Sequence, residues 1–141
     1  MAPLPGPREV RVKVHSCAVA YRDLLDRQGA FPFMRQPTIL GHEFAGVVER
    51  VGEEVGGALR VGSRVASLHW AQRDAWPSPF SNGGKGAQSM FGLTVDGGYA
   101  EFVTCDESGL VPVPDGWSSA QAAPVPMGRR SIVSDRMKRF V

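Results

Sequence analysis

The chain has 141 residues, of which 43% are hydrophobic and 21% are charged, and these values are ordinary for one soluble globular domain with a real core. The net charge of +2 is too small to indicate a nucleic-acid partner, and no apolar run is long enough to cross a bilayer. These two features favour a protein with no nucleic-acid or membrane partner. Two cysteines cannot form a disulfide framework, so we expect a cytoplasmic protein.

The 17 glycines and 11 prolines favour a mainly-β fold of short strands and many turns over a helical bundle. The first strand is predicted at residues 9–17, where apolar and polar side chains alternate. The apolar positions are Val10, Val12 and Val14, and the polar positions are Arg11, Lys13 and His15. The alternation predicts a half-buried strand with His15 on its solvated side.

One or two turns of helix are predicted at Arg22–Gln28, with Gly29 as the stop. A second strand is predicted at Phe44–Val51, because valines recur there between two glycine breakers. Val61–Leu68 has the composition of the next strand. We therefore expect one short helix between the first two strands.

The stretch from Trp70 to Thr94 shows no steady periodicity and predicts a long loop. Its glycine run at residues 83–86 lacks the spacing of a phosphate-binding loop, so we interpret it as a flexible linker.

Beyond this loop, Tyr99–Cys105 predicts a strand and Leu110–Pro114 an extended segment. Ser118 is a good N-cap for a short helix that prolines would soon stop. From residue 128 the chain turns basic and loses any strand pattern. We therefore expect a domain at 1–127 and a disordered tail at 128–141.

The dipeptide His42-Glu43 is the first candidate site, because it lies where a loop becomes a strand on a rigid scaffold. A histidine offers a metal ligand or an acid/base near neutral pH, and the neighbouring glutamate could orient it or bind the metal itself. The alternative is a structural histidine at the start of the strand with a solvated glutamate. A lone His-Glu pair favours this alternative on spacing alone.

The order of these features resembles the N-terminal GroES-like domain of the medium-chain, zinc-type dehydrogenase/reductase superfamily. The matching stretches are Pro5–Val14, Asp23, Pro37–Val48, Val61–Val65, Asp96–Glu101 and Val111–Ser118. The resemblance implies an irregular β-barrel with one or two short helices, beside a separate nucleotide-binding domain. It also implies hydride transfer between NAD(P) and a small alcohol, aldehyde, ketone or quinone.

The chain departs from the zinc-type pattern of this family at several positions. The position of the first zinc-binding cysteine falls on Ala20, and Cys17 lies three residues earlier. The later ligand should fall near residues 124–128, which contain no Cys, His, Asp or Glu. His42 remains, with Glu43 as an occasional substitute, whereas zinc needs three protein ligands even in open sites. The resemblance therefore implies a degenerate metal site at Ala20, His42 and Glu43.

The family's proton-passing Ser or Thr is replaced by Arg22, and residues 70–94 lack the cysteines of a structural zinc lobe. No G-x-G-x-x-G occurs, so we expect no cofactor bound by this chain alone and a chain truncated before the nucleotide-binding domain.

Two functions follow from these observations. In the first, the chain is the catalytic-domain portion of an NAD(P)-dependent oxidoreductase, zinc-free and inactive alone. By the resemblance, Ala20, Tyr21, Arg22 and Asp23 would line the substrate side, with His42 and Glu43 at its base. In the second, the chain is a non-enzymatic interaction module, either a truncated partner of a full-length dehydrogenase or a co-chaperonin-like protein. Homo-oligomerisation is compatible with both.

Overall fold

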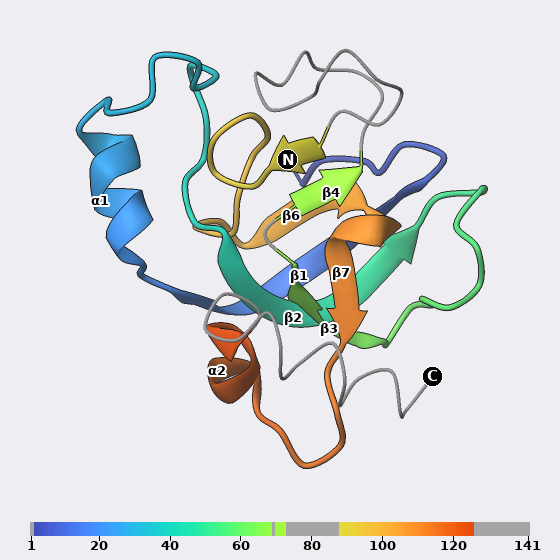
Figure 1. Cartoon of the computed structure of the whole chain (residues 1–141). Coiled ribbons are helices and arrows are strands. Elements are labelled where there is room, and N and C mark those ends of the chain that lie inside the picture. The colour runs from blue at the N-terminus through green and yellow to red at the C-terminus, as the bar shows by residue number, and fades with distance from the viewer. Residues whose placement is uncertain (1, 69, 73–87, 126–141) are drawn as a thin grey trace.

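The computed structural model describes residues 2–68, 70–72 and 88–125 (Figure 1). The predicted linker at residues 83–86 and the predicted tail at 128–141 lie outside the described residues. The elements in chain order are β1 Glu9–Ala18, α1 Tyr21–Arg27, β2 Glu43–Val51, β3 Arg64–Ser67, β4 Trp70–Gln72, β5 Gln88–Met90, β6 Phe102–Asp106, the 3₁₀ turn η1 Glu107–Gly109, β7 Leu110–Pro112 and α2 Ser119–Ala122.

Five strands form one antiparallel sheet in the order β6-β1-β2-β3-β7, and β4 pairs with β5 in a separate two-stranded ribbon. β1 and β2 are the longest strands and lie at the centre of the molecule (Figure 1). Pro112 sits on the outer strand β7, where the missing N–H removes no inner ladder bond. The predicted mainly-β class is confirmed.

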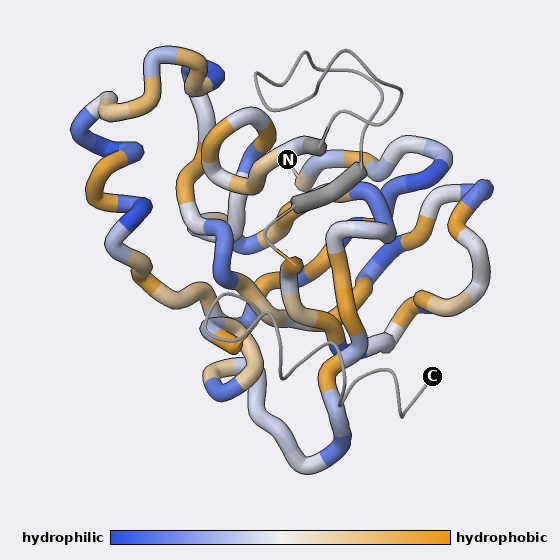
Figure 2. Tube along the Cα trace, in the orientation of Figure 1, coloured by the Kyte–Doolittle hydropathy of each residue, from blue (hydrophilic) through white to orange (hydrophobic). Residues whose placement is uncertain are grey.

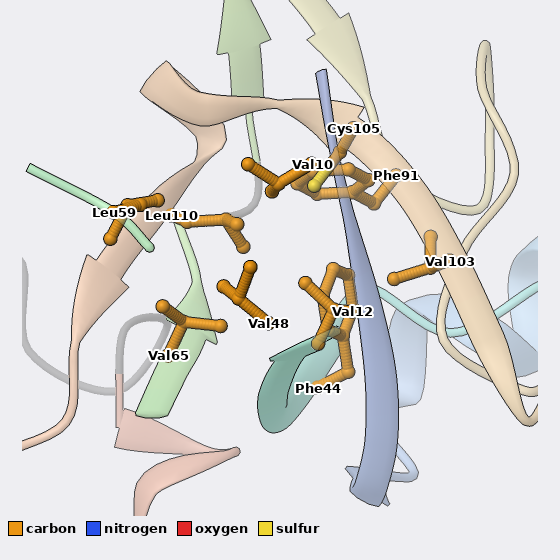
Figure 3. Packing of buried hydrophobic residues seen from close by; sticks show 10 residues of the cluster. All are labelled: Val10, Val12, Phe44, Val48, Leu59, Val65, Phe91, Val103, Cys105 and Leu110. Atoms are coloured by element: carbon orange, nitrogen blue, oxygen red, sulfur yellow. The ribbon is translucent and has the colours of Figure 1, made fainter. Parts of the chain in front are cut away.

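The main core lies on one face of this sheet. The alternation predicted for β1 is confirmed, because Val10 and Val12 are fully buried while Lys13 and His15 are exposed. The ten buried side chains shown in Figure 3 are Val10, Val12, Phe44, Val48, Leu59, Val65, Phe91, Val103, Cys105 and Leu110. Figure 2 shows that the hydrophobic segments run through the central strands, while α1 and the outer turns carry most of the hydrophilic ones.

A smaller cluster packs on the opposite face of the sheet. Ala45 and Ala66 directly follow Phe44 and Val65 of the main core, and successive side chains of a strand point to opposite faces. The cluster consists of Ala45, Ala66, Val113, Ala122 and Ala123. It brings α2 against the sheet. The predicted N-cap is confirmed, since the Ser118 hydroxyl accepts a 3.2 Å hydrogen bond from the Gln121 N–H.

The interpretation of residues 70–94 as a structureless loop is wrong in the described part of that segment. β4 and β5 pair there, and Phe91 and Leu93 are almost fully buried. The Phe91 ring meets the Phe44 ring edge-on at 5.1 Å between centroids. Short strands and buried turns of three or four residues are too brief to show a hydrophobic period, so the sequence pattern missed them.

Two strand boundaries also differ from those predicted. Gly62 adopts φ +90° in the turn before β3, so that strand begins at residue 64 instead of 61. β6 begins at residue 102 instead of 99, because the Gly98 and Tyr99 N–H groups bond the carbonyls of Gly41 and Leu40. None of the helices in the described residues is both long and apolar enough to span a membrane.

Candidate functional site

The dipeptide His42-Glu43 lies at the start of β2 and is buried. His42 has no exposed surface, and Glu43 is 9% exposed. The alternative of a solvated glutamate is therefore wrong. Ser67 at the end of β3 holds the backbone on both sides of Glu43, because its hydroxyl donates to the His42 carbonyl at 2.7 Å and accepts from the Phe44 N–H at 2.9 Å.

Asp23 joins Ala20, His42 and Tyr99 through hydrogen bonds to its carboxylate. Its carboxylate is 4% exposed, yet it has three partners. Oδ2 accepts from the Ala20 N–H at 2.8 Å and from the Tyr99 hydroxyl at 2.9 Å, and Oδ1 lies 3.1 Å from Nδ1 of His42. A carboxylate only accepts hydrogen bonds, so the imidazole proton lies on Nδ1. The first turn of α1 thus places Asp23 against a histidine that follows 19 residues later.

Tyr99 is a member of the site that the sequence analysis missed. It is 39% exposed, and its hydroxyl also lies 3.2 Å from the Ala18 carbonyl, so it joins the end of β1 to Asp23. Burial, followed by the bond to Asp23, raises the pKa of Tyr99. The sequence feature that could have pointed to Tyr99 is the Gly97-Gly98 pair directly before it. The backbone at Gly98 and Tyr99 bonds the carbonyls of Gly41 and Leu40, which places Tyr99 close to the start of β2.

Arg22 and Asp26 form a second pair next to this network. Nε of Arg22 donates to Oδ2 of Asp26 at 3.1 Å, one helical turn along α1, and a guanidinium N–H donates to the Phe91 carbonyl. The Arg22 side chain is 14% exposed and that of Asp26 is fully buried. Burial lowers the pKa of Arg22 and raises that of Asp26. Tyr21, in contrast, is 75% exposed.

The charges of these groups act on one another. Burial and then the Arg22 cation lower the pKa of His42, although Asp23 opposes them. Burial and then the Asp23 charge raise the pKa of Glu43. Cys17 lies beside them, and burial followed by the Asp23 charge raises its pKa to about 12. The site therefore combines a neutral imidazole, a fixed cation and a carboxyl group that is easily protonated.

The loop at residues 35–42 is hydrogen-bonded to the segment after β5. Arg35 pairs with Asp96, whose carboxylate also accepts from the Ile39 N–H at 3.0 Å. Burial acts against the Asp96 charge, but these bonds lower the pKa of Asp96. Gly41 adopts φ +92°, and a Cβ there would lie 2.7 Å from the Tyr99 ring. The close approach of this loop to Tyr99 therefore requires glycine.

Zinc, which the family resemblance implies, does not fit the described residues. They contain no group of three or more His, Cys, Asp or Glu side chains that could hold a metal ion. Ala20, whose N–H donates to one oxygen of Asp23 while His42 lies against the other, has only a methyl side chain. A methyl group cannot replace a thiolate ligand, and the nearby Cys17 thiol stays protonated at neutral pH.

The described strand pairings of both sheets are antiparallel. A dinucleotide site of the family type needs a parallel βαβ unit with a glycine-rich turn at a helix N-terminus. The described residues contain no such unit.

Comparisons with known proteins match this architecture. The family model of the alcohol dehydrogenase GroES-like domain matches residues 6–115. The chain is 38% identical over 128 residues to an acryloyl-coenzyme A reductase of Sulfurisphaera tokodaii, covering 88% of this chain and 37% of that protein. The chain therefore belongs to the alcohol dehydrogenase GroES-like domain family of medium-chain oxidoreductases, and it spans little more than a third of the length of this relative.

Two solved structures share the fold. A crystal structure of an NAD-dependent alcohol dehydrogenase superimposes with a TM-score of 0.74 at 29% identity, over 89% of this chain and 37% of that one. A cobalt- and zinc-bound alcohol dehydrogenase from Pyrobaculum aerophilum gives 0.73 at 29% identity, over 90% of this chain and 39% of that one. The predicted GroES-like class is confirmed.

Proposed function

We propose that this chain is the substrate-side portion of an NAD(P)-dependent medium-chain oxidoreductase that acts on a small alcohol, aldehyde, ketone or quinone without zinc. The observation that carries the proposal is the fully buried His42, whose Nδ1 lies 3.1 Å from Asp23 at the start of β2. A histidine buried against a carboxylate in a family of oxidoreductases has the chemistry of an acid/base group. The similarity to an acryloyl-coenzyme A reductase adds conjugated thioesters to the candidate substrates.

Each of the five side chains predicted from the sequence has a proposed role. Asp23 holds the proton of His42 on Nδ1, so Nε2 is the basic nitrogen of the ring. Glu43, with its raised pKa, is a second proton carrier at the same strand start. Arg22 provides positive charge where a carbonyl oxygen gains negative charge. Tyr21, which is exposed, lines the mouth of the site.

The nicotinamide, when bound, supplies or accepts the hydride. The chain covers 37% of the acryloyl-coenzyme A reductase relative, and we propose that the nicotinamide-binding domain lies in the part of the relatives that it does not span and that the chain alone is inactive. The residues described here bind and orient the substrate and move its proton.

Calorimetric titration of NADH and of NADPH into the 141-residue chain tests this proposal. We expect no binding at micromolar concentration and no change in nicotinamide absorbance with a panel of aldehydes and quinones. A micromolar dissociation constant for either cofactor would contradict the claim of inactivity. Size-exclusion chromatography in the same buffer tests the interaction-module alternative, which predicts a ring-sized oligomer.

A further inference from the structure

The anchoring of Arg22 is not explained by helix formation alone. The side chain leaves α1 and reaches the Phe91 carbonyl, 69 residues further along the chain, while its Nε stays bonded to Asp26. The Phe91 ring packs edge-on against Phe44, which is two residues past His42. The guanidinium is therefore fixed from two sides beside the start of β2, with 14% of the side chain exposed.

The surroundings of this cation are acidic. Asp23, Asp26 and Glu43 are 4%, 2% and 9% exposed, and all three interact electrostatically with Arg22. Buried carboxylates need a compensating positive charge, which proteins provide with a basic side chain or with a metal ion. The described residues hold no set of three metal-ligating side chains, whereas Arg22 forms an ion pair with Asp26 in this cluster.

We infer that the guanidinium of Arg22 supplies the fixed positive charge that a metal ion would supply among these buried acidic side chains, and that it keeps divalent cations out. This inference rests on the proposed zinc-free function and deepens it. Metal binding at this cluster is then opposed for two separate reasons. One is the missing ligand at Ala20, and the other is repulsion between a divalent cation and Arg22.

The two reasons can be separated by substitution. Ala20→Cys restores a thiolate ligand next to Asp23 and leaves the Arg22 charge in place. Ala20→Cys combined with Arg22→Thr or with Arg22→Gln restores the ligand and removes the charge. Glutamine keeps an amide donor for the Phe91 carbonyl, so it preserves the anchor if threonine loosens α1. The matched control is Ala20→Cys combined with Arg27→Thr, which removes an exposed arginine from the same helix.

Cobalt(II) is the probe, because coordination by a thiolate gives charge-transfer absorption that other sites do not. Each variant is titrated with Co²⁺ alone at neutral pH, and zinc affinity is then measured by competition. Cys17 is present in every variant, so differences between variants arise from the substitutions at positions 20, 22 and 27. Circular dichroism and thermal melting show which variants are folded.

We expect no thiolate–cobalt band for the wild-type chain, and at most a weak one for Ala20→Cys and for its combination with Arg27→Thr. A variant that combines Ala20→Cys with a neutral residue at position 22 should bind Co²⁺ at least tenfold more tightly. Equal affinity for Ala20→Cys with and without Arg22 would overturn the inference and leave the zinc-free function standing. Failure of both folded neutral variants to gain affinity would overturn it as well. Tight, His42-dependent metal binding by the wild-type chain would overturn the zinc-free function itself.

Discussion

Replacement of Gly41 by alanine should disturb the site, because this glycine combines a positive φ with close contact to Tyr99. Its φ is +92°, a conformation that costs an L-residue about 1–2 kcal/mol. An added Cβ would also lie 2.7 Å from the Tyr99 ring and 2.8 Å from the Cys17 sulfur, distances that require something to move. Overpacking of a filled region costs about 1–3 kcal/mol. We therefore expect Gly41→Ala to lower the free energy of unfolding by about 2–5 kcal/mol.

Gly62 is a matched control for the backbone part of this effect. Its φ is +90°, and an added Cβ meets no atom within 4 Å. Gly62→Ala should therefore lose only about 1–2 kcal/mol. Urea unfolding followed by circular dichroism gives both free energies under one set of conditions. If the two variants lost the same stability, the contact between Gly41 and Tyr99 would not be tight, and the reasoning that places Tyr99 over the site would be refuted.

Three further predictions concern the site and its support. Tyr99→Phe removes a hydrogen bond to buried Asp23 and should lower the free energy of unfolding by about 1–2 kcal/mol. Tyr21→Phe, at a 75% exposed residue, should change it by no more than about 0.5 kcal/mol. Equal losses in urea unfolding would contradict the hydrogen bond between Tyr99 and Asp23. Phe91→Ala should lose about 3–5 kcal/mol by the same measurement, because its ring is fully buried, and a loss below about 1 kcal/mol would show that this segment does not pack in the core. Glu43→Gln should stabilise the chain at neutral pH and have no such effect near pH 4, as seen in thermal melts across this range. The sign follows from the raised pKa of Glu43 in the folded state. Such a carboxyl contributes stability at pH values below its ordinary pKa of 4.5, and this contribution is lost as the pH rises through the folded-state pKa. Glutamine stays neutral, so it avoids this loss. A stabilisation that did not change with pH would contradict the burial of its charge.

The elements with a local period were predictable from the sequence. β1 alternates apolar and polar residues from Val10 to His15, and β2 shows β-branched residues between glycines. α1 ends near a glycine, and α2 starts at Ser118 with a capping box. In each case the signal lies within a few residues of the element that it predicts, because strand alternation and helix capping are local interactions.

The buried aromatic pair and the short strands could not be found in this way. Phe91 lies in a turn, and only its packing on Phe44 makes it part of the core. β6 starts three residues later than its composition suggests, since residues 98–99 bond the loop at 40–41. Such contacts join segments more than forty residues apart, and no periodicity within either segment records them.

The candidate site shows the same division. The sequence alone determined the residue types: a histidine and a glutamate at the start of a strand, an aspartate in the first turn of a helix, and an arginine and an alanine before it. Spacing alone favoured a structural histidine. The resemblance to the dehydrogenase family indicated chemistry at this strand, and the ligands that the family pattern requires and this chain lacks argued against a metal. Each of these inferences needs only the identity and order of residues, compared with the pattern of the family.

Only the tertiary structure decided how these side chains meet. It buries Glu43, orients His42 through Asp23, adds Tyr99 from a loop 76 residues beyond that aspartate, and anchors Arg22 on the Phe91 carbonyl while leaving Tyr21 exposed. The physical reason is that desolvation and hydrogen bonding depend on what surrounds an atom in space. The sequence around His42 supplies a side chain that can act as a base. The packing of α1, β2 and the loop at 91–99 around His42 determines the protonation of the imidazole and its partners.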